Sequence, residues 1–254
     1  MSLQQDAAAL LGKAFTLFKS DRLDEAIDIY DQLDQQFKHN QGISIEKQVA
    51  EAKLNKGLVL IQLNRLEAAI SEFNEFDQRY KSRKELVIEG LCTKALINKG
   101  IALGRLKLME EAIEAFNELS KRFKNRNESI LNHALITALS NKAEFVLISQ
   151  NKKAAKLAIQ EALSLISDDH KQERAVMELL SFIIDESTIE TVFTFIENIP
   201  DEEELAWSFK ELIEKVESLE TPKKEQLEAI ARFFEEHKDK AKLREELDEI
   251  QRKL

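Results

Sequence analysis

A 43-residue period constrains this chain more than any single residue does. Three series of equivalent positions keep that step: Lys13, Lys56, Lys99 and Lys142; Ala26, Ala69, Ala112 and Ala155; and Tyr30, Phe73, Phe116 and Ile159. A fixed period of this length is typical of a solenoid, in which each unit buries its apolar face against its neighbours. Such an architecture presents a long surface that usually binds other proteins.

The composition favours an all-helical, soluble chain. Hydrophobic residues make up 43% and charged residues 33% of the 254 residues, which is ordinary for helix-rich proteins. Only six Gly and two Pro interrupt the sequence, so there is little of the punctuation that a sheet requires. The formal net charge of −10 argues against nucleic acid as a partner, because such binding needs a basic face.

The single cysteine and the apolar runs bear on the compartment. Cys92 has no partner for an internal disulfide, and Val49 and Leu135 fill its slot in the neighbouring units, so we expect a buried thiol in a reducing environment. The segment that opens the sequence lacks the basic region of a signal peptide. No apolar run approaches the roughly 20 residues that a transmembrane helix needs. We therefore expect a cytoplasmic protein with no membrane partner.

Each unit is expected to form two amphipathic helices joined by a tight turn. In the second unit, apolar residues recur three and four apart over residues 50–63, which predicts a first helix. Asn64 supplies the turn, because Asn readily leaves helical geometry, and a second helix follows over residues 66–80. Gly57 and Gly100 share one slot inside the first helices, where Gly costs about 1 kcal/mol relative to Ala. Close packing of the facing helix is the expected reason.

The second and third units share one residue pattern. In the second unit it comprises Ala50, Ala52, Asn55, Gly57, Leu60, Leu66, Ala69, Ile70 and Phe73. The third unit repeats it with Asn98, Gly100, Leu103, Ala112, Ile113 and Phe116. This pattern resembles the tetratricopeptide repeat, and a match in the first unit and a weaker match in the fourth extend the resemblance over about residues 6–169.

The resemblance implies a fold and a domain organisation. It implies an all-α, right-handed α-solenoid over residues 1–169, followed by a helical C-terminal cap or bundle over residues 170–254. The four repeats are expected at about 6–40, 43–83, 86–126 and 129–169.

Two features depart from the family pattern. The period exceeds the usual 34 residues, and the apolar pattern of the extra residues (Ile43, Ile45 and Val49) predicts added turns on the first helix of a unit. The lysine series occupies a slot where the family commonly has Leu. Because a buried unpaired Lys is costly, we expect these lysines to be solvated at the surface, with a row of ligand-binding lysines as the alternative.

The C-terminal third loses the period but keeps helical spacing. A helix is expected over residues 172–186, and capping residues at Ser187, Asp201 and Thr221 predict further helices. The segment from Leu243 to Leu254 has a short coiled-coil-like seam. It would either dock on the preceding helices or pair two copies of the chain.

No motif in the sequence supports catalysis. The four histidines are scattered, and there is neither a Gly-rich phosphate loop nor a nucleophile elbow. The run Asp168-Asp169-His170 is a weak metal-ligand candidate at a repeat end, where solvated polar residues are expected in any case. We expect no enzyme activity, no cofactor and no metal, and a hidden hydrolase would lack a recognisable nucleophile.

The tetratricopeptide resemblance implies a binding groove on the first helices. Its ligand-backbone positions correspond to Asn55, Asn98 and Asn141, since a carboxamide both donates to and accepts from peptide groups. The neighbouring apolar positions are Phe15, Leu58 and Ile101, and the basic positions are Lys19, Lys94 and Arg105. The alternative for the Asn residues is a hydrogen bond within the fold.

These features together predict a non-enzymatic protein–protein interaction scaffold. The partner is expected to be a protein or peptide segment, with an acidic or C-terminal segment favoured by the basic positions. The alternative is a self-assembling or autoinhibited structural protein that uses its C-terminal helices, either as a homo-oligomer or within its own groove.

Overall fold

The computed structural model describes residues 2–40, 42–149, 151–166 and 171–184, together with positions 225, 228 and 232. The longer ranges contain nine helices: α1 (Leu3–Lys19), α2 (Leu23–Phe37), α3 (Ile43–Gln62), α4 (Leu66–Tyr80), α5 (Leu86–Arg105), α6 (Met109–Phe123), α7 (Ser129–Ile148), α8 (Lys152–Leu165) and α9 (Lys171–Ile183). The chain divides into two compact units, Met1–Ala138 and Leu139–Leu254. The division falls within α7.

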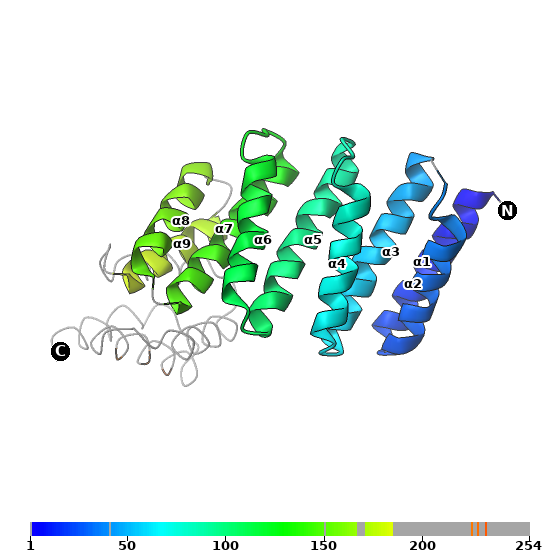
Figure 1. Ribbon diagram of the computed structural model, residues 1–254, viewed down its shortest axis with the longest axis horizontal. Helices are drawn as coiled ribbons and strands as arrows, with labels where there is room; N and C mark the ends of the chain where they lie inside the picture. Colours follow the sequence, from blue (N-terminus) through cyan, green and yellow to red (C-terminus); the bar gives the residue numbers. More distant parts are fainter. Residues whose placement is uncertain are drawn as a thin grey trace. The chain divides into compact units, whose positions relative to one another are not determined.

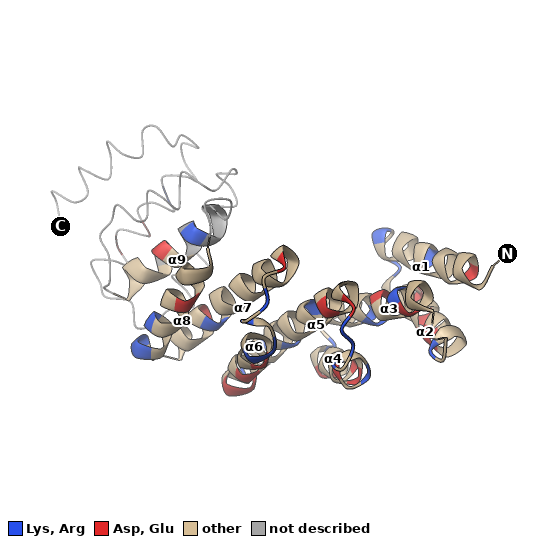
Figure 2. Cartoon of the chain, turned by 90° about the horizontal axis from the view of Figure 1, so that it is seen from above, with Lys and Arg blue, Asp and Glu red and all other residues tan. Residues whose placement is uncertain are grey.

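The first unit is a row of helical hairpins. Consecutive helices from α1 to α6 pack on one another, and the first helices of the hairpins also touch, α1 against α3 and α3 against α5. These first helices form one layer and α2, α4 and α6 form the other (Figures 1 and 2). The expected all-α solenoid of consecutive hairpins is therefore confirmed.

The first helices are longer than the second helices. α3, α5 and α7 each contain 20 residues, whereas α4 and α6 contain 15. The added turns begin at Ile43 and Leu86, and Ile45 and Ile88 within them are buried. The residues that lengthen the period are thus part of the packed helix, as the apolar pattern predicts.

Each hairpin turn in the first unit uses one left-handed residue. Asp21, Asn64 and Lys107 lie one period apart and have φ of 57°, 57° and 62°. In each turn the next amide donates to the carbonyl five residues earlier, for example Arg65 N–H to Leu60 O at 2.8 Å. This is the Schellman arrangement that ends many helices. The predicted turn at Asn64 is confirmed. Asn adopts the left-handed conformation more readily than the Lys at position 107 does.

Close helix packing explains the two helical glycines. A Cβ atom on Gly57 would lie 2.4 Å from Cε1 of Phe73, and one on Gly100 would lie 2.5 Å from Cε1 of Phe116. Both rings are buried, with exposed fractions of 1% and 0%. The rings of the second helices therefore fill the space that the missing side chains leave, as expected from the sequence.

Small and apolar residues form the core of each unit. The alanine series Ala26, Ala69, Ala112 and Ala155 is fully buried at every member. Cys92 is buried as expected, and burial raises the pKa of its thiol to about 12.

The second unit is described through the end of α7, α8 and α9. Asn151 caps α8 by accepting a hydrogen bond from the amide of Ala154 at 3.0 Å, and α8 packs against α9. α9 corresponds to the helix expected over residues 172–186. Of the further helices expected after Ser187, only positions 225, 228 and 232 are described, and all three are helical. The seam from Leu243 to Leu254 lies outside the described residues. None of the described helices is both long and apolar enough to cross a membrane.

Candidate functional site

The first helices of the first unit leave the expected groove positions accessible, and on α5 these positions form one narrow stripe. On α5, the accessible residues beyond the first turn are Lys94, Asn98, Lys99, Ile101 and Arg105. The same stripe on α3 contains Glu51, Asn55, Leu58 and Gln62. Both stripes lie one period apart and coincide with the expected groove positions. Leu58 has an exposed fraction of 37%, so it presents apolar surface to solvent.

On α1 the equivalent stripe ends in an aromatic and basic pair. Phe15 has an exposed fraction of 51%. The Lys19 ammonium lies 5.4 Å from the centroid of the Phe15 ring, which is a cation–π distance. The ring of Phe18 is 6.4 Å away from that of Phe15. Phe15 and Lys19 therefore form one combined apolar and basic contact surface.

Asn55 and Asn98, the two expected ligand-backbone positions in the first unit, have different surroundings. Asn55 shares a hydrogen bond with the hydroxyl of Tyr30 on α2. Burial raises the pKa of Tyr30, and this hydrogen bond acts in the opposite direction. The ring that corresponds to Tyr30 at the next repeat is Phe73, which has no hydroxyl. Within the described part of the chain, Asn98 forms no hydrogen bond through its carboxamide.

The basic groove positions also differ from one another. The guanidinium of Arg105 donates to the carbonyl of Ile61 at 3.3 Å and to Oδ1 of Asn64 at 3.2 Å, so it contacts the turn between α3 and α4. Lys94 is exposed and forms no ion pair among the described residues. Asn141 is half-buried on the part of α7 that belongs to the second unit.

A buried ionic network lies at the first junction, where α3 packs between α2 and α4. Lys53 Nζ is 2.6 Å from Oε1 of Glu72, and both residues are less than 10% exposed. Lys56 Nζ lies 2.9 Å from Oε2 of Glu72 and 2.6 Å from Oδ1 of Asp31. The hydrogen bonds to both carboxylates raise the pKa of Lys56 although burial opposes this effect.

The network corrects the expectation for the lysine series. Lys56 is not a solvated surface lysine but a half-buried partner of two carboxylates. The sequence feature that could have indicated this pairing is Glu72 on the next helix. The equivalent position one period later is Ala115. Lys13 is exposed, as expected.

No metal site is found among the described residues, where no three His, Cys, Asp or Glu side chains cluster suitably. The weak candidate Asp168-Asp169-His170 falls outside them.

The packed row of hairpins defines the class of protein as an α-solenoid. A family model of the tetratricopeptide repeat matches residues 50–81 and 93–125, two segments whose starts lie one period apart. Residues 50–81 and 93–125 are therefore tetratricopeptide repeats, as the residue pattern predicts. A search of curated proteins finds no match.

Solved structures show the same fold. A tetratricopeptide repeat protein from Parabacteroides merdae matches with a TM-score of 0.55 and 17% identity, over 97% of this chain and 93% of that one. A structure described as the MamA RS-1 ArsTM double mutant matches with a TM-score of 0.50 and 14% identity, over 78% of this chain and 95% of that one. At such identities the likeness concerns the fold alone.

Proposed function

We propose that the chain is a non-enzymatic scaffold that binds an extended segment of another protein along the exposed stripes of α1, α3 and α5. The tetratricopeptide repeats in this chain support a general role in protein–protein interaction. The observation that carries the specific proposal is the single accessible stripe on α5, because almost every other side chain of that helix is buried.

The stripes combine the chemistry that an extended peptide needs. Asn98 offers a carboxamide with free donor and acceptor capacity, and each such hydrogen bond contributes about 1 kcal/mol net. Leu58 and Phe15 offer apolar surface beside it. Lys94 and Lys19 add positive charge, so the proposed segment carries acidic groups, including a C-terminal carboxylate.

Substitutions on the stripe test this proposal. Peptides are first selected on the wild-type protein from a random displayed library, and their affinities are then measured by calorimetry. We expect Asn98→Ala combined with Leu58→Asp to weaken the selected peptides by about tenfold or more, since about 1.4 kcal/mol corresponds to a factor of ten.

A matched control separates the stripe from general surface effects. Leu157→Asp changes another exposed leucine, 60% accessible, on α8 of the second unit. The affinity of this control should stay within about twofold of wild type. Equal affinities for the wild type and the stripe variant would contradict the groove.

A further inference from the structure

The connections that follow α2, α4 and α6 lie at one edge of the first unit (Figure 1). Each connection begins with a lysine at the helix C-cap, and these lysines are one period apart: Lys38, Lys81 and Lys124. Lys84 adds a further charge after α4. We call these four lysines the basic edge. Figure 2 looks onto it and shows basic residues along the connections between α4 and α5 and between α6 and α7.

The lysines of the basic edge are uncompensated. All four are exposed, and none forms an ion pair among the residues described. A lysine at a helix C-terminus complements the helix dipole, which explains the three cap positions but not Lys84. The whole chain has a net charge of −10, so this edge runs against the average charge of the protein.

The arginines beside the basic edge have a structural task. Arg126 Nη1 lies 2.8 Å from Oε1 of Glu89, which is only 3% exposed. Arg83 pairs with Glu46 in the same way one period earlier. These pairs hold the connection after α4 against α3 and the connection after α6 against α5. Lys81, Lys84 and Lys124 are therefore presented by anchored connections.

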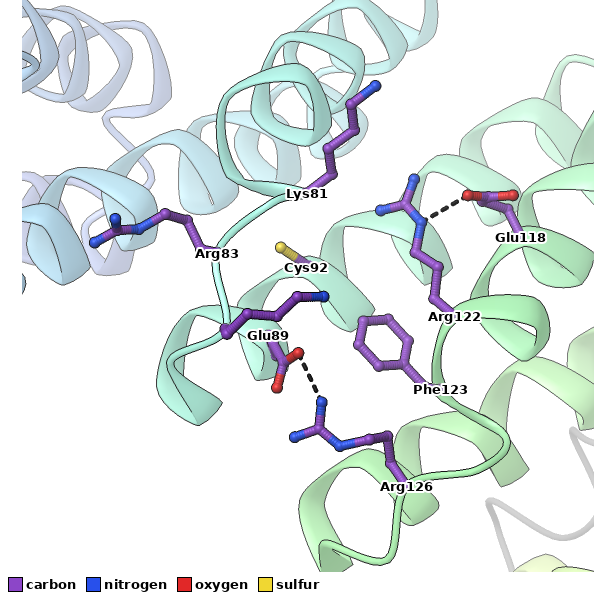
Figure 3. A pocket seen from close by; sticks show the side chains of 9 residues that line it. Lys81, Arg83, Glu89, Cys92, Glu118, Arg122, Phe123 and Arg126 are labelled. Atoms are coloured by element: carbon purple, nitrogen blue, oxygen red, sulfur yellow. Dashed lines mark hydrogen bonds and ion pairs between the residues drawn. The ribbon is translucent and has the colours of Figure 1, made fainter.

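A pocket lies between the connection that follows α4 and the connection that follows α6. Its volume is about 290 Å³, and Lys81, Lys84, Cys92, Arg122 and Phe123 are among its lining residues. In Figure 3 Cys92 lies between Lys81 and Phe123, with the pair of Arg122 and Glu118 to its right and the pair of Arg126 and Glu89 below it. A pocket of this size admits a side chain.

The pocket recurs one period earlier. Lys38, Glu46, Arg79 and Arg83 line a second pocket of about 540 Å³, and they occupy the slots of Lys81, Glu89, Arg122 and Arg126. A recurring pocket with a free lysine at each copy fits a ligand that repeats its charge along its length.

Apolar residues border the same edge. The first turns of the first helices expose Ile43, Leu86 and Val87, with accessible fractions of 44%, 43% and 38%. These residues directly follow the connections. The edge therefore offers alternating basic and apolar contacts, which a purely anionic polymer would not use.

We propose that the basic edge is a second docking surface, separate from the stripes of α1, α3 and α5, and that it binds an extended acidic segment of a partner protein with apolar residues between its carboxylates. Carboxylates spaced along an extended segment, which advances about 3.3 Å per residue, would meet the lysines, and the apolar residues between them would meet Ile43, Leu86 and Val87.

Two variants of equal charge test the docking surface. The probe is a labelled synthetic peptide of repeated Glu-Leu-Ser triplets, and its affinity for the full chain is measured by fluorescence anisotropy at low and at physiological salt. Lys81→Glu with Lys84→Glu should weaken binding by about tenfold or more, because attraction becomes repulsion at the contact. Lys152→Glu with Lys153→Glu, exposed positions on α8, should leave it within about twofold.

Further arms separate this surface from other ligands and from the groove. A peptide of the same composition with its glutamates in one block should bind at least severalfold more weakly. Leu58→Asp should leave binding of the triplet peptide unchanged. The proposal is overturned if the two charge reversals act equally, if the block peptide binds as well, if Leu58→Asp weakens binding as much, or if phosphatidylserine vesicles or duplex DNA bind more tightly than the peptide.

Discussion

The two junctions of the first unit have the same geometry but different contents. At the first junction, Lys53, Lys56 and Glu72 form a buried ionic network with Asp31. At the second junction, where α5 packs between α4 and α6, the corresponding residues are Leu96, Lys99, Ala115 and Asn74. Leu96 is 4% and Ala115 is 5% exposed. One backbone arrangement therefore accepts either paired charges or apolar side chains.

The comparison indicates what the ionic network contributes. Burying charges carries a desolvation cost that pairing only offsets, so an apolar replacement is often neutral or stabilising. The helix packing common to both junctions, with Gly57 facing Phe73 and Gly100 facing Phe116, holds them together. The network therefore need not add net stability at the first junction.

The largest effect is expected from breaking the network on one side. Glu72→Ala leaves Lys53 buried at 7% exposure without its closest partner, which should cost about 3–5 kcal/mol in the free energy of unfolding. Lys53→Leu with Glu72→Ala copies the second junction and should come within about 1.5 kcal/mol of wild type. Urea denaturation measures both. A double variant as unstable as Glu72→Ala would contradict the equivalence of the junctions.

A smaller loss is expected from filling either close contact. Gly57→Ala and Gly100→Ala each place a Cβ atom against a buried ring, so each should lose about 1–3 kcal/mol through overpacking, although Ala is the better helix former. The control is Gly12→Ala on α1, since nothing lies within 4 Å of its added Cβ atom. That variant should gain about 1 kcal/mol, and thermal melting distinguishes the signs. A gain at Gly57 would show that the ring moves aside freely.

The smallest effect is expected from making the aromatic slots alike. Tyr30→Phe copies Phe73 and removes the hydrogen bond with Asn55, so it should cost about 1 kcal/mol or less. Phe73→Tyr is the reciprocal change. If the hydroxyl of Tyr30 has no structural role, urea denaturation will give the same midpoint for Tyr30→Phe and wild type.

The period made most of the first unit predictable from the sequence. Glycine opposite aromatic rings, a turn at Asn64 and longer first helices all follow from residues that recur one step apart, because equivalent positions share one environment. The network escaped prediction for the opposite reason. Lys53 and Glu72 occur in a single unit, so no repetition marks them, and only the packing of three helices shows that their charges meet.

The candidate site was predictable only in position. The stripe that contains Asn55, Leu58, Asn98 and Ile101 follows from helical periodicity. The partner of Asn55 does not, because it depends on whether the facing ring carries a hydroxyl. The basic edge was missed although Lys38, Lys81 and Lys124 keep the same step, since lysines at helix ends are common in any helical protein.

Two equivalent ion pairs, one period apart, join successive hairpins of the first unit in the same way. Arg79 reaches back 45 residues to Asp34 at 2.6 Å, and Arg122 reaches back 45 residues to Asp77 at 2.5 Å. The hairpin of α3 and α4 thus carries both Arg79, which pairs with the preceding hairpin, and Asp77, which pairs with the following one. Excising residues 43–85 would bring Arg122 opposite Asp34, so an ion pair between neighbouring hairpins would form again. The whole 43-residue hairpin is therefore the natural unit by which such a protein is shortened or extended.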